Sequence, residues 1–247
     1  MCCLFGFIDY AGALSVTQKS RLIRELSIAA EVRGTDATGI AYNTSRGLQI
    51  YKRPLAAHRL HLRIPAEAHV VMGHTRMTTQ GSAKKNYNNH PFFGCVKGKS
   101  FALAHNGVLW NDRELRHTKH LPKTRIQTDS YVAVQLLEQQ KSLDFDSLAK
   151  MAEQVEGSFS FTVLDEQNAL WIVKGDNPLT IVHFPAVGVY VYASTAEILN
   201  KALARCGNWL GREEKGDIAM GDIVRIDGNG RITRGAFDAS KFYRSSW

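Results

Sequence analysis

The sequence predicts an α+β protein in which antiparallel β-sheets are covered by helices. Short apolar stretches with strand character occur in groups, and the two clearest internal helices follow one another directly. This order differs from the strand–helix alternation that indicates a parallel sheet. The chain also has no GxGxxG or Walker A pattern, so the nucleotide-binding α/β folds lack their usual sequence support.

The N-terminal half is expected to begin with a strand at 4–8 and a helix. Ser15 and Gln18 form a capping-box pattern ahead of this helix, and Gly34 is suited to ending it. Residues 76–100 lack any period and are expected to form one long loop. Asn106-Gly107, directly after an apolar stretch, is a strong turn signal. The other strands expected in this half are 38–42, 48–51, 68–74 and 101–105.

The C-terminal half is expected to be rich in strands after two helices at 129–140 and 145–155. Ser194 and Glu197 form a second capping-box pattern ahead of another helix. The strands expected here are 158–164, 170–174, 180–184 and 187–192, and a last hairpin joins 222–226 to 231–234. Neither a linker nor an internal repeat occurs, so we expect one domain over 1–247, with a core of roughly 2–235 and a short C-terminal tail.

Composition and cysteine usage limit the classes of function. The chain of 247 residues is 44% hydrophobic and 22% charged, as is typical of globular proteins. No apolar run is long enough for a membrane helix, and the N-terminal MCCLFGF lacks the basic residues of a signal peptide. We therefore expect a cytoplasmic protein without a membrane partner. No CxxC pair occurs, and the spacings of His74, His90 and His105 match no zinc signature, so neither a metal nor a cofactor is expected.

The formal net charge is +8, which is compatible with an acidic partner. Basic residues are densest at 113–125, with a smaller cluster at Lys84 and Lys85. Because no aromatic-interleaved motif accompanies either stretch, we do not expect nucleic acid as a partner.

Cys2 is the first candidate for a catalytic residue, because removal of Met1 would leave it at the N-terminus. A free α-amino group has a pKa of about 7.7–8.0 and a thiol one of about 8.5, so a proton passes between them at little cost near neutral pH. An N-terminal amine is an accepted base for such a nucleophile. Position alone is weak support, since many proteins carry a second-residue cysteine by chance.

Other segments would complete a site for an amino acid that carries an amide. Asn106 and Gly107 would offer a side-chain amide and a backbone N–H to an oxyanion, unless they only form a hairpin turn. Arg76 would bind a carboxylate in a bidentate manner. Asp129 would pair with an ammonium group, although an N-cap role for the helix that follows is a common use of Asp. Thr79 would supply a neutral hydrogen bond.

Taken together and in this order, these motifs resemble the class II glutamine amidotransferase domain. This domain is the N-terminal-cysteine glutaminase of glucosamine-6-phosphate synthase, amidophosphoribosyltransferase and glutamate synthase. The resemblance extends over roughly residues 2–230. The matching segments are MCCLFG at the start, RGTDATG at 33–39, GHTRMTTQG at 73–81, NNHPF at 88–92, AHNGVLWN at 104–111, TDS at 128–130, EGSFSFTVLD at 156–165, KGDNPL at 174–179, YAST at 192–195 and GDIVRID at 221–227.

The resemblance implies a four-layer αββα sandwich of two antiparallel sheets, the N-terminal nucleophile hydrolase fold. It also implies that glutamine is hydrolysed to glutamate and ammonia through a γ-glutamyl thioester. The implied site consists of Cys2 as nucleophile with its own amine as base, Asn106 and Gly107 as oxyanion hole, Arg76 for the α-carboxylate, Asp129 for the α-ammonium, Thr79 in the substrate loop, and Arg33 and Gly34 near the nucleophile.

The sequence departs from the family pattern at three positions. Cys3 replaces the small glycine after the nucleophile, where it would crowd the site, and Met77 and Gln80 stand where Trp and His are frequent. Family members continue into a synthase domain, so we expect a separate synthase subunit to receive the ammonia, and a homo-oligomer stays open. The alternatives are a stand-alone hydrolase of other γ-glutamyl amides and a non-enzymatic basic binding module.

Overall fold

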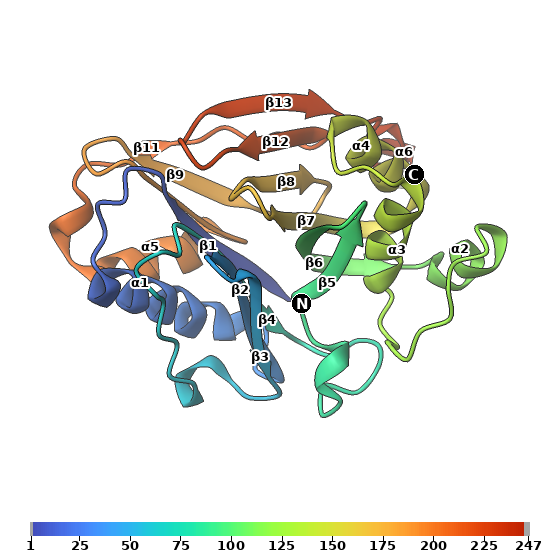
Figure 1. The fold of residues 1–247 in the computed structure, drawn as a ribbon, viewed down its shortest axis with the longest axis horizontal. Helices are drawn as coiled ribbons and strands as arrows, with labels where there is room; N and C mark the ends of the chain where they lie inside the picture. The colour runs from blue at the N-terminus through green and yellow to red at the C-terminus, as the bar shows by residue number, and fades with distance from the viewer. Residues whose placement is uncertain (1, 245–247) are drawn as a thin grey trace.

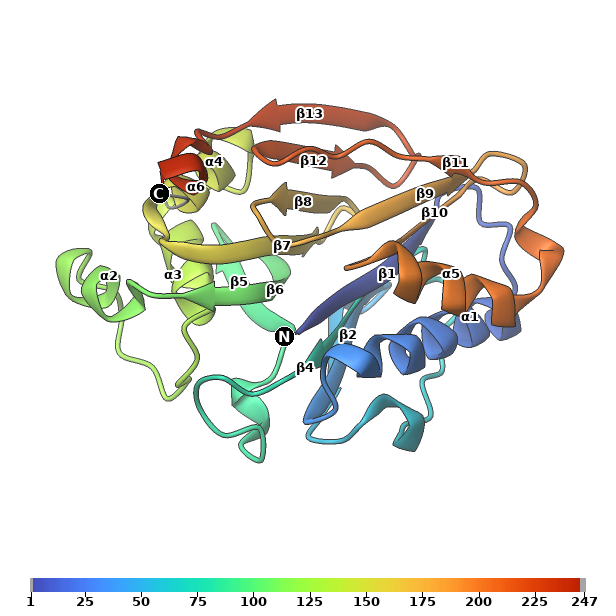
Figure 2. The same ribbon diagram turned by 180° about the vertical axis from the view of Figure 1, so that it is seen from behind.

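The computed structural model describes residues 2–244 and contains two antiparallel sheets packed face to face between two layers of helices (Figures 1 and 2). Three apolar clusters hold these layers together. One lies between the first sheet and its helices, one between the second sheet and its helices, and one between the sheets. The four-layer αββα sandwich expected from the sequence is therefore confirmed.

The first sheet has seven strands in the order β11-β9-β10-β1-β4-β2-β3. Helices α1 (Val16–Ala29) and α5 (Ala196–Cys206) pack on its outer face. The strands are β1 (Cys3–Asp9), β2 (Ala37–Thr44), β3 (Gly47–Arg53), β4 (Val70–Arg76), β9 (Thr180–Phe184), β10 (Val189–Ala193) and β11 (Glu214–Lys215).

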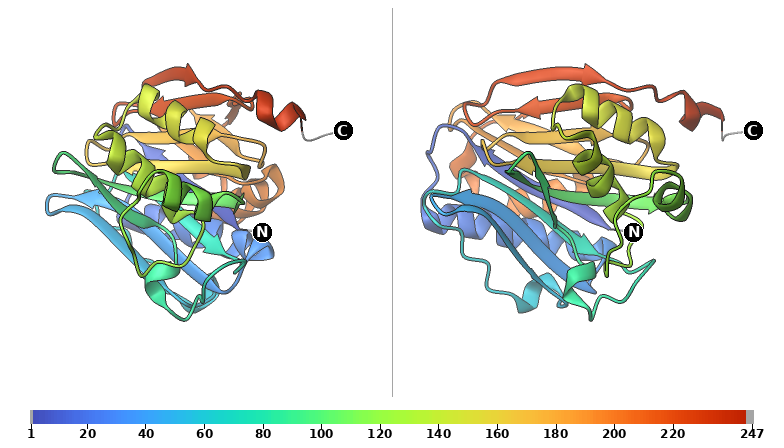
Figure 3. Two further views of the ribbon diagram at one scale, coloured as in Figure 1. Left: turned by 90° about the vertical axis from the view of Figure 1, so that its right-hand side faces the viewer. Right: turned by 45° about the vertical axis from the view of Figure 1, so that its right-hand side comes forward.

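The second sheet has six strands in the order β13-β12-β8-β7-β6-β5. Helices α3 (Tyr131–Gln140) and α4 (Phe145–Gln154), yellow-green in Figure 3, lie across its outer face. The strands are β5 (Phe92–Val96), β6 (Lys99–Leu109), β7 (Gly157–Asp165), β8 (Leu170–Lys174), β12 (Asp222–Ile226) and β13 (Ile232–Ala236). The remaining helices are α2 (Asp112–Thr118) and α6 (Ser240–Arg244), with 3₁₀ turns η1 (Ala30–Arg33), η2 (Ala57–Arg59), η3 (Asn86–Asn88) and η4 (Asn208–Leu210).

Strand β1 is buried along its whole length, because both of its faces are covered. Phe5 and Phe7 pack against the helix layer, whereas Leu4 and Ile8 pack into the cluster between the sheets. Within residues 2–244 no helix is long and apolar enough to cross a membrane.

The helix boundaries agree only in part with the capping signals of the sequence. Ser15 and Gln18 form the expected capping box, but α1 gives way to η1 before Gly34. The expected box at Ser194 and Glu197 is wrong. Thr195 is the N-cap of α5, and its side chain accepts a hydrogen bond from the Ile198 backbone N–H. The Ser194 hydroxyl instead accepts one from the Leu4 N–H.

Two further expectations are corrected by sheet pairing. Residues 76–100 are not one loop, because they contain η3 and β5, which pairs with β6. Asn106-Gly107 is not a hairpin turn. Strand β6 continues to Leu109, since β7 provides partners for it as far as Gly157. Helix α2, strand β11 and helix α6 had no expected counterpart, because short elements carry little periodic signal.

Three buried histidines lie where the two sheets meet. The His74 ring nitrogen Nε2 lies 3.0 Å from the His105 carbonyl oxygen, which links β4 to β6. The His74 and His90 rings are 4.2 Å apart. Burial lowers the pKa of His74 to about 3 and holds that of His90 well below its ordinary value, so both rings are neutral at pH 7.

These histidines predict a loss of stability in acid. The unfolded chain binds their protons near pH 6.5 while the folded protein does not, so stability is present above pH 6.5 and falls as the pH drops toward 3. His74 and His90 each contribute a slope of about 1.4 kcal/mol per pH unit in that window. Urea denaturation at several pH values should show a smaller slope for His90→Phe than for wild type. The exposed His61→Phe is the matched control and should keep the wild-type slope. Equal slopes for all three proteins would contradict the prediction.

Candidate active site

Cys2 precedes β1 and lies where the first sheet meets β6, next to the N-terminus marked in Figures 1 and 2. Pairing of β1 with β4 sets Cys3 opposite Thr75, so Cys2 lies beside the end of β4. The Cys2 thiol donates to the Met77 carbonyl oxygen at 3.5 Å. The Cys2 carbonyl oxygen accepts a hydrogen bond from the Arg33 guanidinium Nε at 2.9 Å. Together, the two contacts hold the thiol and the backbone of Cys2, the nucleophile expected from the sequence, in place.

Burial raises the pKa of the Cys2 thiol above its ordinary value. The Met77 hydrogen bond and the positive charge of Arg76 oppose this effect, while the negative charge of Asp129 adds to it. The thiol is therefore protonated at neutral pH and needs a base before it reacts.

A small pocket brings together five of the eight residues selected from the sequence. Its lining includes Cys2, Arg76, Thr79, Gly107 and Asp129. The cavity volume is about 10 Å³, which is close to the space that one water molecule needs. Thr79 is exposed in the segment that follows β4, and this segment closes the pocket on one side.

Arg76 ends β4 and is only 3% exposed. Its guanidinium donates to the Asn89 side-chain oxygen at 2.7 Å and to the Gln80 carbonyl oxygen at 2.6 Å. Within the described part of the chain it forms no ion pair with a carboxylate. Its charge is thus held by neutral acceptors, which suits a guanidinium that binds the carboxylate of a ligand.

Asp129 is 4% exposed and reaches the pocket from the segment before α3. One carboxylate oxygen accepts a hydrogen bond from the Leu109 backbone N–H at 2.7 Å. The N-cap of α3 is Ser130, so the alternative role of Asp129 as an N-cap is wrong. A buried carboxylate with a single backbone donor and a neighbouring hydroxyl keeps acceptor capacity for an ammonium group.

Asn106 and Gly107 lie within β6, and of the two only Gly107 lines the pocket. Gly107 has φ of 145°, and a side chain there would meet the Ser158 carbonyl oxygen at 1.9 Å. Only glycine therefore fits between β7 and the pocket. The Asn106 side-chain nitrogen lies 3.4 Å from the Ser194 hydroxyl, a long contact that leaves this donor weakly engaged. The side-chain oxygen of Asn106 has no partner among residues 2–244.

Arg33 and Gly34 lie behind the pocket and do not line it. A side chain at Gly34 would come within 2.4 Å of the Arg76 backbone carbon, so glycine permits the close approach of the two segments. Arg33 holds the Cys2 backbone. Arg33 therefore lies next to Cys2, whereas Gly34 lies next to the backbone of Arg76 and Met77.

Cys3 does not crowd the pocket. It is fully buried, and its side chain packs in the cluster between the first sheet and its helices. Burial raises the pKa of its thiol to about 11. The expected conflict between the two cysteines is therefore wrong, because the strand places Cys3 among the helix-facing residues of β1.

Sequence reasoning missed several residues of the pocket. His90 and His105 line it, although the sequence indicated neither as a site residue. His105 Nδ1 lies 2.8 Å from the Ser130 hydroxyl, whereas neither ring nitrogen of His90 has a hydrogen-bond partner among residues 2–244. Met77 contributes through its carbonyl oxygen, which no sequence pattern reveals. No cluster of His, Cys, Asp or Glu suited to a metal ion occurs in the described part of the chain.

Comparisons with known proteins find relatives whose names all refer to glutamine-dependent transfer. The model of a family described as glutamine amidotransferase domain matches residues 74–201. A glutamine–fructose-6-phosphate aminotransferase of Sulfurisphaera tokodaii is 29% identical, over 73% of this chain and 31% of its own length. The enzyme of that name from Bacillus anthracis is 32% identical, over 73% of this chain and 30% of its own length. The chain thus spans about a third of the length of these curated relatives.

Two solved structures share the fold. Glutamine phosphoribosylpyrophosphate amidotransferase from B. subtilis has a TM-score of 0.71 at 19% identity, covering 96% of this chain and 49% of its own. A predicted glutamine amidotransferase from Pseudomonas aeruginosa has a TM-score of 0.52 at 16% identity, covering 94% of each chain. Because the family model matches 74–201, more than half of the 247 residues, the chain belongs to the glutamine amidotransferase domain family.

Proposed function

We propose that the chain hydrolyses the side-chain amide of glutamine, with Cys2 as nucleophile once Met1 has been removed. The observation that carries this proposal is the meeting of Cys2, Arg76 and Asp129 in one pocket, although they are far apart in the sequence. A thiol flanked by a buried cation and a buried anion matches a zwitterionic amino acid with a reactive group at its far end.

In the proposed reaction the free amine of Cys2 takes the thiol proton, and the thiolate attacks the δ-carbonyl carbon of glutamine. The Asn106 side-chain amide and the Gly107 backbone stabilise the oxyanion that forms. The Cys2 ammonium group returns this proton to the amide nitrogen, the carbon–nitrogen bond breaks, ammonia leaves, and a γ-glutamyl thioester remains. Water then attacks the thioester carbonyl carbon and gives a proton to the Cys2 amine; the carbon–sulfur bond breaks, glutamate leaves, and the amine returns the proton to the thiolate.

Substrate entry requires a movement of the segment 77–81. A cavity of about 10 Å³ does not hold glutamine. Met77, Thr78 and Thr79 are exposed, and we propose that this segment moves outward to admit the substrate and closes over it afterwards.

We further propose a synthase as the acceptor of the ammonia. The names of the relatives describe transfer of an amino group to fructose 6-phosphate, and the matched region is about a third of their length. The alternative, hydrolysis of other γ-glutamyl amides, uses the same residues and differs only in the leaving amine. It predicts similar kcat/KM for glutamine and for γ-glutamyl amides with larger leaving groups.

The first test concerns the nucleophile. Cys2→Ala should lower glutaminase activity by at least about a thousandfold, because removal of a nucleophile leaves only binding and oxyanion stabilisation. Cys3→Ala is the matched control and should stay active. Intact-mass analysis after treatment with a diazoketone analogue of glutamine should show loss of Met1 and one adduct on Cys2. An adduct on Cys3, or unchanged activity of Cys2→Ala, would overturn the assignment.

The second test concerns the ammonium partner. Asp129→Asn should raise KM for glutamine roughly 10- to 100-fold, as expected when a charge-assisted hydrogen bond is lost. A purely structural role would affect all substrates equally, so 4-carbamoylbutanoate, which lacks the α-ammonium group, provides the comparison. Wild type should prefer glutamine strongly in kcat/KM, and the variant should lose most of this preference. An unchanged preference would show that Asp129 does not bind the ammonium group.

A further inference from the structure

A groove outside the candidate active site combines positive charge with aromatic rings. Its volume is about 690 Å³, within the usual range for sites that bind small molecules. The cations Lys52, Lys85 and Arg125 line it, and none of its lining residues is acidic. Four aromatic residues line it as well: Tyr87, Phe92, Phe93 and Tyr131.

The groove is where the two basic stretches of the sequence meet. Lys85 belongs to the Lys84–Lys85 cluster and Arg125 to the stretch 113–125, and the proposed reaction uses neither. Two hydrogen bonds join the segments: the Gln127 backbone N–H donates to the Asn88 side-chain oxygen at 2.9 Å, and the Asn88 side-chain nitrogen donates to the Gln127 side chain at 3.2 Å. Tertiary contacts therefore build the groove. The basic stretches contain no aromatic residue, and the aromatic rings of the groove come from other segments of the chain.

The groove positions its positive charges without neutralising them. The Arg125 guanidinium lies 4.9 Å from the centre of the Tyr87 ring, and the Lys52 ammonium lies 5.1 Å from that of Phe92. Lys52 donates to the carbonyl oxygens of Asn89 and Pro91. Burial, followed by the charge of Arg76, lowers the pKa of Lys52 to about 8. An anion in the groove would stabilise the charged form of Lys52 against its burial and the charge of Arg76.

Phe93 supplies a surface for stacking. It lies on β5, at the edge of the second sheet, and is 53% exposed, whereas the neighbouring Phe92 is 1% exposed. An aromatic ring left half in water beside uncompensated cations is the combination on which bases stack while phosphates pair with lysine and arginine.

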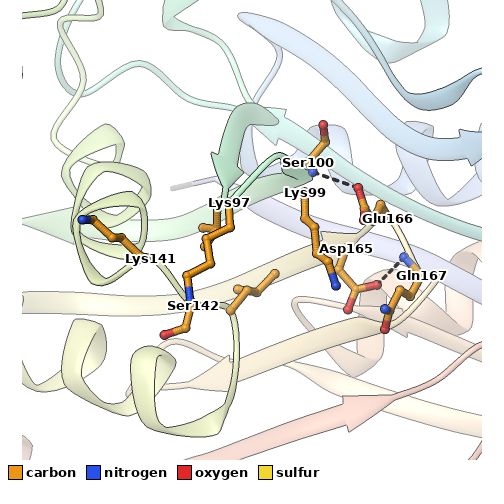
Figure 4. A pocket seen from close by; sticks show the side chains of 10 residues that line it. Lys97, Lys99, Ser100, Lys141, Ser142, Asp165, Glu166 and Gln167 are labelled. Atoms are coloured by element: carbon orange, nitrogen blue, oxygen red, sulfur yellow. Dashed lines mark hydrogen bonds between the residues drawn. The ribbon is translucent and has the colours of Figure 1, made fainter.

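A second hollow of about 260 Å³ does not share these properties (Figure 4). It lies between the β5–β6 turn and the turn after β7, and Lys97 and Lys99 face it. Its lining also includes Asp165 and Glu166, whose carboxylates accept hydrogen bonds from the Gln167 and Ser100 backbone N–H groups. Both positive and negative side chains line this hollow, and no aromatic ring does. Its lining therefore favours no particular class of ligand.

We propose that the groove binds a nucleotide, with the phosphate between Lys85 and Arg125 and the base stacked on Phe93. A volume of about 690 Å³ accommodates one nucleotide, so we take a single small molecule as the occupant and leave an extended strand as an outcome of the test. The groove shares no lining residue with the candidate active site, so nucleotide binding there does not depend on the proposed hydrolysis.

Calorimetric titration of the full chain with adenosine 5′-monophosphate tests the proposal, with inorganic phosphate and adenosine as partial ligands. Each partial ligand should bind more weakly than the nucleotide. Lys85→Gln and Arg125→Gln should each weaken nucleotide binding about three- to fivefold, as expected for charge pairs near solvent. Phe93→Ser should weaken it at least about fivefold through lost stacking. Lys84→Gln and Lys123→Gln are matched controls, since both side chains are exposed neighbours that do not line the groove, and they should bind as wild type does.

Three outcomes would overturn the proposal. One is the absence of saturable nucleotide binding at millimolar concentrations. Another is equal weakening by the groove variants and by the Lys84 and Lys123 controls, which would indicate attraction to the net charge of the whole protein. The third is much tighter binding of an oligouridylate that depends equally on all four basic residues, which would identify a single-stranded nucleic acid as the occupant.

Discussion

The burial of β1 on both faces is the constraint on which the candidate site depends. Leu4, Phe5, Phe7 and Ile8 are fully buried, and burial of such side chains contributes about 1.5–3 kcal/mol each. A strand held this firmly cannot shift its register without moving every side chain to the opposite face. Cys2 immediately precedes this strand, so the packing of the core fixes its position relative to β4 and β6.

The pocket keeps buried charges in an arrangement that a zwitterion would complete. Arg76 is held by neutral oxygens, and Asp129 accepts a backbone N–H. Burial of unpaired charges is costly unless hydrogen bonds or a partner compensate for it. The protein meets part of this cost with carbonyl and amide groups, and an α-carboxylate and an α-ammonium group would meet the rest. Under the proposed function, the cost of burying these two charges would favour an amino acid as the ligand.

One short segment links the candidate active site to the basic groove. Asn89 accepts a hydrogen bond from Arg76 through its side chain and another from Lys52 through its backbone carbonyl. Asn86 accepts a hydrogen bond from the Asn89 side chain and lines the groove. Arg76 also lowers the pKa of Lys52, so the two sites share an electrostatic environment as well as a scaffold.

The sequence by itself determined the residue types of the site and most of the strands, because alternating burial and short motifs are local properties. It thereby indicated Cys2, Arg76 and Asp129 without showing that they meet. Tertiary structure decided what depends on partners far along the chain. Pairing with β7 places Asn106-Gly107 within a strand instead of a turn, and packing of β1 places Cys3 on the face that the helices cover. The groove also arose only in three dimensions, since its cations and aromatic rings come from segments that no local pattern connects.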